Sequence, residues 1–225
     1  MSRTRHDAAV TRGPGQADRG DPDDPLAGSA VTTRRGDDGS TGLLFGGSRI
    51  AKDDPRAEAY GTVDEAVAAF GLARAELLAR TALGTLPPAL VGMADLVLRL
   101  QRELFVAGAE LAANPDAWDR MRDGETRISI EMLDALDATL ADVERRVRMP
   151  HEFVVPGETR ISAALELART ILRRAERRAV ALEHAGLIPG EYLLAYLNRL
   201  SDLAWVLARA AEQAERRPSR PSRPG

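Results

Sequence analysis

Strong helix formers, with no glycine or proline, fill the stretch Ala168-Arg169-Thr170-Ile171-Leu172-Arg173-Arg174-Ala175-Glu176-Arg177-Arg178. This composition predicts the interior of a long helix. Arg169, Arg173 and Arg177 recur every four residues and therefore share one face of that helix. Like charges at this spacing repel one another and weaken an isolated helix. Taken alone, the arginines fit a solvated face best. An anion opposite them would also explain them, and it could be partner carboxylates, a nucleotide polyphosphate, or both.

Capping residues and apolar spacing predict four further helices around this one. The five predicted segments are residues 62–80, 88–113, 129–147, 162–185 and 189–215. Thr62 and Glu65 match a capping box, Ser129 a helix cap, and Gly186 a residue that closes a helix. Alternating strand patterns of useful length are absent from the sequence. Five long helices joined by modest loops predict an all-α, up-down five-helix bundle.

Composition limits the function classes that such a domain can serve. The chain has 225 residues, of which 44% are hydrophobic and only 4% aromatic, which favours helices packed on helices. A net charge of −3 gives no general reason to expect a nucleic acid or a membrane as partner. The lack of cysteine excludes disulfides, thiolate nucleophiles and cysteine metal sites. Since no apolar signal core is visible, we expect a cytoplasmic protein.

The two ends of the chain differ from the middle. Residues 1–31 are rich in Asp, Arg, Gly and Pro, and we expect them to be disordered. Residues 216–225 carry prolines at a spacing that forbids a helix, and we expect a disordered Arg/Pro tail there. The predicted helical-bundle domain therefore spans residues 32–215.

The glycine-rich segment 33–42 is the first candidate site. Glycines allow tight turns whose N–H groups can cradle a phosphate. The segment lacks the Gly-Lys-Ser/Thr ending of a Walker loop, and most loops of this composition are ordinary connections. Lys52, a short way along the chain, could contact phosphate or could be a surface lysine.

Two further segments place unusual residues at defined positions. The last predicted helix carries a polar stripe on a largely apolar surface, formed by Asn198, Ser201, Asp202 and Trp205. Such a stripe faces either water or a polar site within the bundle. Asp202 opposite an arginine of the 162–185 helix would form either a structural ion pair or part of a ligand site. The loop 150–158 is pinned by two prolines and can hold Phe153 at a fixed place, although core packing is the usual role of such a phenylalanine.

Several longer motifs occur in one order over about residues 32–213. They are Gly36-Asp37-Asp38-Gly39-Ser40-Thr41-Gly42, Lys52-Asp53-Asp54-Pro55-Arg56, Glu58-Ala59-Tyr60-Gly61-Thr62-Val63-Asp64-Glu65, Gln101-Arg102-Glu103-Leu104-Phe105, Gly108-Ala109-Glu110-Leu111-Ala112, Phe153-Val154-Val155-Pro156-Gly157, Ala168-Arg169-Thr170 with Arg173-Arg174-Ala175-Glu176-Arg177, and Tyr196-Leu197-Asn198-Arg199-Leu200-Ser201-Asp202-Leu203. Together these motifs resemble the PduO-type ATP:cob(I)alamin adenosyltransferase family.

The resemblance implies a homotrimer with active sites between subunits. It implies transfer of the 5′-deoxyadenosyl group of ATP to the cobalt of cob(I)alamin (a corrinoid), which releases triphosphate. It also implies Mg²⁺, and a cobalamin-dependent mutase and a corrinoid reductase as further partners. Because Co(I) is itself a strong nucleophile, no serine, cysteine or histidine nucleophile is needed. The protein would supply position and charge.

The resemblance also implies roles for individual residues on the nucleotide side. The ATP loop would be formed by Thr33, Gly36, Asp37, Gly39, Ser40 and Thr41. Lys52 and Arg173 would contact the phosphates, while Glu176 and Asn198 would organise the Mg²⁺-triphosphate.

On the corrinoid side, the resemblance implies that Phe153 lies below the corrin and displaces its lower axial base. Loss of that ligand makes Co(II) easier to reduce to Co(I).

The resemblance also implies a contact between subunits. Arg169 would pair with Asp64 of a neighbouring subunit, and Arg174 and Asp202 would support this network.

Four positions depart from the family pattern. Arg35 replaces a small hydroxyl residue, Glu158 lies in the usual Pro-Gly-Gly-Ser turn, Glu166 replaces a common histidine, and Trp205 replaces a phenylalanine. Glu158 and Glu166 add negative charge near the expected nucleotide site. Arg35, Glu158 and Glu166 motivate an alternative, a non-catalytic corrinoid- or nucleotide-binding paralogue that acts as a carrier or regulator. The retained Arg column and Asn198-Asp202 pair favour the enzyme.

Overall fold

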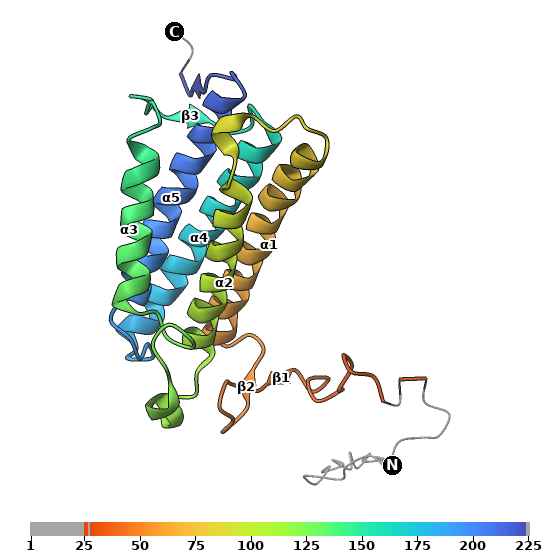
Figure 1. Cartoon of the computed structure of the whole chain (residues 1–225). Coiled ribbons are helices and arrows are strands. Elements are labelled where there is room, and N and C mark those ends of the chain that lie inside the picture. Colours follow the sequence, from red (N-terminus) through yellow and green to blue (C-terminus); the bar gives the residue numbers. More distant parts are fainter. Residues whose placement is uncertain (1–24, 27, 224–225) are drawn as a thin grey trace, which may run out of the picture. The chain divides into compact units, whose positions relative to one another are not determined.

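The computed structural model describes residues 25–26 and 28–223 (Figure 1). The chain divides into two units, Met1–Asp38 and Gly39–Gly225. Most of the predicted disordered arm, residues 1–31, lies outside the described residues. In the first unit, the Asp37 N–H donates to the Arg34 carbonyl oxygen at 3.2 Å and closes a turn.

The described part of the second unit is a bundle of five α-helices. They are α1 Pro55–Ala82, α2 Met93–Ala112, α3 Ile130–Glu144, α4 Arg160–His184 and α5 Leu193–Ala214. Consecutive helices run in opposite directions along the bundle (Figure 1). The predicted all-α, up-down five-helix bundle is therefore confirmed.

Helix α4 forms the centre of the bundle. It packs against α1 and α5, while α2 packs on α1 and α3 packs on α5. The apolar faces meet in one core, where Leu77 of α1, Leu172 of α4 and Leu200 of α5 are fully buried. Each buried leucine contributes about 1.5–3 kcal/mol relative to an exposed one. The face of α4 that carries the arginines is therefore built on a well-packed support.

The predicted start of the first helix is wrong. Helix α1 begins at Pro55, and the side chain of Asp54 caps it by accepting from the Arg56 N–H at 2.8 Å. Proline suits the first helical position, where its missing N–H costs nothing. Thr62 lies inside the helix, where its hydroxyl donates to the Glu58 carbonyl oxygen at 2.6 Å. The sequence Thr62-Val63-Asp64-Glu65 fits a capping box, but an earlier cap already starts the helix.

Three other helix starts also differ from the prediction. Pro88–Leu90 forms a short 3-10 helix, η1, and α2 begins only at Met93, after Gly92 with a φ of +84°. Thr159 caps α4, because its hydroxyl accepts from the Ser162 N–H at 3.0 Å. Helix α5 begins at Leu193 rather than between 189 and 191. Turn and cap geometry thus shifts boundaries that apolar spacing alone leaves uncertain.

Two predicted helix boundaries are confirmed, the start of α3 and the end of α4. The Ser129 side chain caps α3 by accepting from the Met132 N–H at 3.3 Å. Gly186 follows α4 with a φ of +67°, and the next N–H, from Leu187, returns to the Leu182 carbonyl oxygen at 2.9 Å. Glycine adopts this left-handed conformation without the strain that a Cβ would add.

Short extended segments flank the bundle. The remaining elements are β1 Ser40–Thr41, β2 Ile50–Ala51, the 3-10 helix η2 Pro115–Arg120, β3 Val154–Val155 and β4 Arg220–Pro221. Strand β1 pairs with β2, and β3 pairs with β4, both antiparallel. The disorder expected for residues 216–225 stays a prediction, but in the structure residues 220–221 extend along β3. Within the described residues, no helix has both the length and the apolar character needed to cross a membrane.

Candidate functional site

The arginines of α4 lie along two adjoining clefts beside α5. Arg169 and Arg173 line a cleft of about 350 Å³ together with Ser201, Asp202 and Trp205 of α5. Arg173 also lines a second cleft of about 280 Å³. The predicted arginine face and the predicted polar stripe of α5 are thus brought together.

Arg173 occupies the position between these clefts. Its guanidinium makes no ion pair or hydrogen bond with the residues that the structure describes, and its side chain is exposed. Its backbone carbonyl accepts from Arg177 Nη1 at 2.9 Å. An unpaired arginine whose neighbours are also cationic is suited to an anionic ligand.

The second cleft holds an oxygen-rich pair. Asn198 Nδ2 donates to Glu176 Oε1 at 3.0 Å, and Arg173, Arg177 and Val180 complete the lining. The hydrogen bond joins α4 to α5 and leaves the Asn198 carbonyl oxygen and one Glu176 oxygen for other partners. The two residues predicted to organise a metal-triphosphate therefore do lie together.

Asp202 does not form the predicted ion pair with an arginine of α4. Its Oδ2 lies 3.8 Å from Nη1 of Arg199 on the same helix, and half of its side chain is exposed. Arg199 also pairs with Asp137 of α3. Asp202 shares the first cleft with Arg169 and Arg173 but, among the described contacts, pairs with neither.

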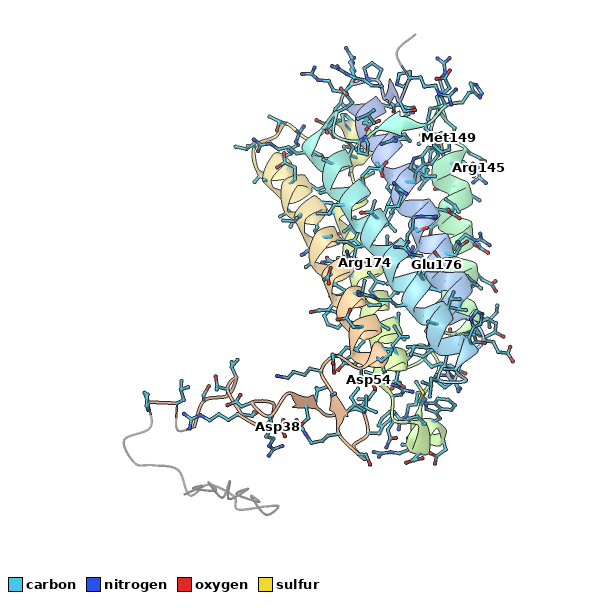
Figure 2. All side chains as sticks on the ribbon, turned by 180° about the vertical axis from the view of Figure 1, so that it is seen from behind. Asp38, Asp54, Arg145, Met149, Arg174 and Glu176 are labelled. Atoms are coloured by element: carbon cyan, nitrogen blue, oxygen red, sulfur yellow. The ribbon has the colours of Figure 1, made fainter. Side chains whose placement is uncertain are left out.

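Arg174 lies on a different side of α4 from Glu176. Figure 2 shows Arg174 toward α1 and Glu176 toward α5. Arg174 pairs with Glu65 of α1, and the next turn repeats the pattern, since Arg178 pairs with Glu58 at 2.6 Å. These contacts join α4 to α1 and do not bring Arg174 into the two clefts.

Asp64 and Arg169 lie in separate clefts of the subunit. Asp64 is exposed on α1, where it lines an apolar cleft of about 430 Å³ shared with α2. Phe105, which is 63% exposed, borders the same cleft. Within the subunit Arg169 pairs instead with Glu166, so the predicted contact with Asp64 is left to a neighbouring subunit.

The phosphate-loop residues of the second unit lie on and beside a small hairpin. Ser40 pairs with Ala51, and the Lys52 N–H donates to the Gly39 carbonyl oxygen at 2.8 Å. Thr41 lies beside Ser40 in β1. Arg49, which the sequence analysis did not single out, donates from Nε to the Ser40 hydroxyl at 2.7 Å. Lys52 is exposed.

The remaining loop residues, Thr33, Gly36 and Asp37, belong to the first unit. Thr33 and Asp37 are exposed there, and Gly36 is half-buried.

Phe153 is an exposed aromatic residue at the end of the bundle where α4 begins. Its side chain is 87% exposed, so the common role of core packing is excluded for it in the subunit. Its carbonyl oxygen accepts from the Ser222 N–H at 2.7 Å. The ring is thus presented to solvent from a backbone that is held on one side.

The family model for cobalamin adenosyltransferases matches residues 31–211 of the chain. The chain belongs to this family. Its curated relatives include a corrinoid adenosyltransferase of Citrobacter freundii, 40% identical over 182 residues, with 81% of this chain and 94% of the relative covered. A corrinoid adenosyltransferase of Mycobacterium tuberculosis is 37% identical, with 80% and 88% covered.

Solved structures agree with this assignment. A variant PduO-type ATP:corrinoid adenosyltransferase of Lactobacillus reuteri, complexed with cobalamin and ATP, superimposes with a TM-score of 0.72 at 28% identity. The match covers 86% of this chain and 96% of that one. A second variant of that protein, complexed with ATP, gives a TM-score of 0.71 with 86% and 100% covered. The bundle is therefore the fold of this adenosyltransferase family.

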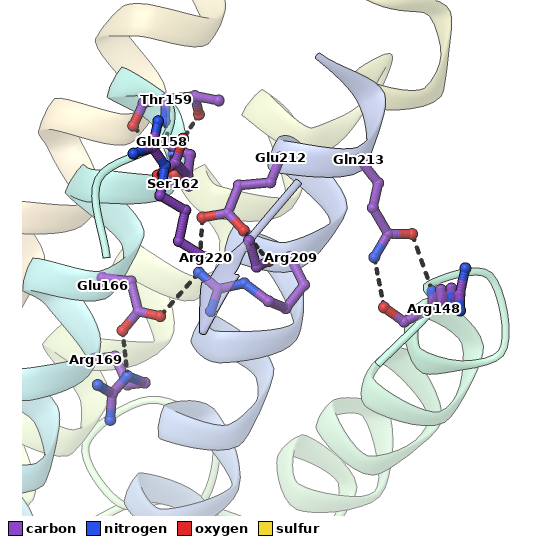
Figure 3. A network of polar contacts seen from close by, with 11 residues as sticks. Arg148, Glu158, Thr159, Ser162, Glu166, Arg169, Arg209, Glu212, Gln213 and Arg220 are labelled. Carbon is purple, nitrogen blue, oxygen red and sulfur yellow. Dashed lines mark hydrogen bonds and ion pairs between the residues drawn. The ribbon is translucent and has the colours of Figure 1, made fainter. Parts of the chain in front are cut away.

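Two acidic departures from the family pattern are charge-paired in the structure. Glu166 is buried and accepts from Arg169 Nε at 2.6 Å, while its other oxygen lies 3.1 Å from Nη2 of Arg209 (Figure 3). Arg209 also pairs with Glu212 at 2.9 Å. Glu158 pairs with Arg220 at 2.8 Å. The negative charges that could oppose a nucleotide are thus compensated within the chain.

Arg209 and its partner Glu212 are buried residues of this network that the sequence patterns did not reveal. The Arg209 side chain is 0% exposed, and its guanidinium carbon lies 5.6 Å from the centre of the Trp205 ring. A lone arginine among Val206, Leu207, Ala208 and Ala210 is the signal that could have revealed it, because a charge on an apolar helix face requires a buried partner.

Proposed function

We propose that the chain transfers the 5′-deoxyadenosyl group of ATP to the cobalt of cob(I)alamin. The cobalt electron pair attacks the C5′ carbon, a Co–C bond forms, and the C5′–O bond breaks. Its electron pair leaves with triphosphate, so the step needs no proton transfer. The products are adenosylcobalamin and triphosphate.

The observation that carries this proposal is the placement of Arg173 between the two clefts. Its guanidinium has no partner among the described residues, and the Glu176–Asn198 pair lies beside it. Positive charge that is in place before reaction stabilises an anionic leaving group, because little reorganisation is then needed. Arg177 adds to this charge, and Lys52 is proposed to contact the phosphates from the ATP loop.

Mg²⁺ fits the chemistry of the Glu176–Asn198 pair. Both side chains offer hard oxygen ligands, and Mg²⁺ commonly takes one or two protein oxygens together with waters and phosphate oxygens. A bound Mg²⁺ neutralises charge on a triphosphate. Glu176 and Asn198 would hold it in the cleft that Arg173 and Arg177 also line.

We further propose a homotrimer whose sites lie between subunits. Two features support it, the exposed Asp64 on the apolar α1–α2 face and the exposed ring of Phe105 beside it. Asp64 of one subunit would pair with Arg169 of its neighbour. Arg169 is already oriented by Glu166, so a second carboxylate would complete its hydrogen bonding.

Phe153 supports the corrinoid side of the proposal. A phenyl ring that is 87% exposed offers an apolar surface for the lower face of a corrin. There it would exclude the axial base and favour reduction of Co(II). A reductase would supply the Co(I) state, and a cobalamin-dependent mutase would use the product.

The alternative is a non-catalytic corrinoid or nucleotide carrier. Its main support was the negative charge of Glu158 and Glu166, and both carboxylates have arginine partners in the structure. Arg35 remains as a departure in the ATP loop. The enzyme is therefore the function that the site supports best.

Arg173→Ala tests the leaving-group role. We expect turnover to fall by at least about 100-fold, because one electrostatic donor to a developing anion is lost. The exposed Arg145, which directly follows α3, offers a matched control, and Arg145→Ala should keep full activity. Helix content by circular dichroism and the size-exclusion volume should be unchanged in both variants. Normal turnover by Arg173→Ala would overturn the role assigned to Arg173.

A further inference from the structure

The C-terminal residues 216–223, here called the C-terminal strap, bind back onto the loop that carries Phe153. Strand β4 pairs with β3, with Val154 opposite Pro221 and Val155 opposite Arg220. The Ser222 N–H then donates to the Phe153 carbonyl oxygen at 2.7 Å. The backbone on the C-terminal side of Phe153 is thus fixed by the strap.

Side chains anchor the same segment at two further points. Arg220 Nε lies 2.8 Å from Oε1 of Glu158, whose side chain is only 17% exposed (Figure 3). The Ser219 hydroxyl donates to Glu212 of α5. Glu212 belongs to the buried network that continues through Arg209 to Glu166. The strap is therefore anchored to α5 through Glu212 and to the turn before α4 through Glu158.

The opposite end of the Phe153 loop is held by α5. The Arg148 N–H donates to the Gln213 side-chain oxygen at 3.0 Å, and the Gln213 amide returns a hydrogen bond to the Arg148 carbonyl oxygen at 2.6 Å (Figure 3). Helix α5 and the C-terminal strap thus hold the loop by hydrogen bonds on both sides of Phe153.

The Phe153 ring makes little packing contact with its own subunit. Because it is 87% exposed, packing cannot fix its position, and only the backbone can. A loop that is ordered before binding does not lose conformational freedom when a ligand arrives, which favours affinity. A free loop would lose that freedom on binding.

We propose that the C-terminal strap positions Phe153 for the corrinoid, with Ser219, Arg220 and Ser222 as positioning residues. The inference rests on the proposed role of Phe153. It assigns Arg220 and Glu158 a shared task, which explains why an acidic residue stands at 158 in this chain. The strap should affect the corrinoid and leave the nucleotide side unaffected.

The test compares full-length variants that differ only in the strap. Arg220→Ala removes the ion pair, and Arg220→Ala/Ser222→Pro also removes the N–H that binds the Phe153 carbonyl. Arg217→Ala is the matched control, since it removes an exposed arginine of the strap whose side chain has no partner among the described residues. A Glu158→Arg/Arg220→Glu double variant tests rescue.

The readouts are KM for cob(I)alamin, KM for ATP, and hydrogen exchange of the amides of residues 152–155. We expect the KM for cob(I)alamin to rise by about 3- to 5-fold in Arg220→Ala, because the variant loses an ion pair whose arginine is exposed. In the Arg220→Ala/Ser222→Pro variant we expect the KM for cob(I)alamin to rise about tenfold, because a backbone hydrogen bond is also lost. The KM for ATP should stay constant, and amide exchange at residues 152–155 should accelerate. The charge-swapped variant should regain the KM for cob(I)alamin and the slow exchange of the unmodified protein.

Two results would overturn the proposal: equal rises in both KM values, or amide exchange at residues 152–155 that matches the Arg217→Ala control. If the unmodified protein transfers no adenosyl group, the proposed function fails while the exchange comparison still decides whether the strap holds the loop.

Discussion

Removing the charge of Arg209 should destabilise the bundle strongly. Its side chain is fully buried between Glu166 and Glu212, whose side chains are 4% and 0% exposed. Arg209→Met keeps much of the length and apolar volume but leaves two carboxylates without their shared cation. Glu166 retains Arg169, and Glu212 retains the Ser219 hydroxyl. Both ion pairs of Arg209 are lost, but only Glu212 is left without a cation. We therefore expect the cost of one uncompensated buried charge, about 3–5 kcal/mol.

Protonation sets an independent limit on this cost. A carboxyl group with an ordinary pKa near 4.3 takes up a proton at pH 7 at a cost of about 4 kcal/mol. A buried carboxylate that loses its cation can take up a proton, so the loss of stability cannot exceed the cost of that protonation. The cost then falls by about 1.4 kcal/mol for each pH unit below 7. At pH 5 the variant should recover about 3 kcal/mol relative to the unmodified protein.

Urea unfolding followed by circular dichroism, at equal protein concentration and at pH 5 and 7, measures both effects. Glu166→Leu/Arg209→Met/Glu212→Leu removes the three buried charges and leaves only Arg169, whose side chain reaches solvent. This variant should be close to the unmodified protein, since apolar replacement of buried ion pairs is often neutral. A loss below about 1 kcal/mol for Arg209→Met at pH 7, or equal losses at both pH values, would refute the reasoning.

Phe153→Ala should slow adenosylation that starts from cob(II)alamin about tenfold more than reaction from pre-reduced cob(I)alamin, measured in parallel spectrophotometric assays; equal slowing would refute the axial-base role. Burial raises the pKa of Glu110 to about 7, although the Ile128 N–H and Arg127 act in the opposite direction. Because this folded-state pKa lies above the unfolded value of 4.5, the stability from Glu110 is complete below pH 4.5 and is lost as pH rises through 7. Glu110→Gln should remove this loss of unfolding free energy, which is about 3 kcal/mol by pH 7 and is measured by urea unfolding. The same pH dependence of stability in the variant and the unmodified protein would contradict the role of Glu110.

Local signals in the sequence predicted much of the bundle. The run from Ala168 to Arg178 has one period and no breaker, so both the helix and its arginine face could be predicted. The Ser129 cap and the Gly186 end follow from side-chain and backbone chemistry within one turn. The start of α1 was missed because Thr62 and Asp54 both have capping chemistry, and only the complete fold selects Asp54.

Contacts between distant segments could not be predicted. The pairing of residues 154–155 with 220–221 involves strands too short to show a period of two. Arg209 joins Glu166 across two helices, and the sequence alone does not specify which acidic residue it meets. The grouping of Arg173, Glu176 and Asn198 was implied by the family resemblance and is found in one cleft. The contact between Asp64 and Arg169 stays a prediction, because it requires a second subunit.

The most direct measurement is the visible spectrum of anaerobically generated cob(I)alamin with the protein, Mg²⁺ and ATP. The proposed activity predicts that the Co(I) band disappears while a light-sensitive alkylcobalamin spectrum grows, and that Arg173→Ala prevents the conversion. A Co(I) band that persists while cobalamin and ATP are both bound would contradict the enzyme and favour the carrier.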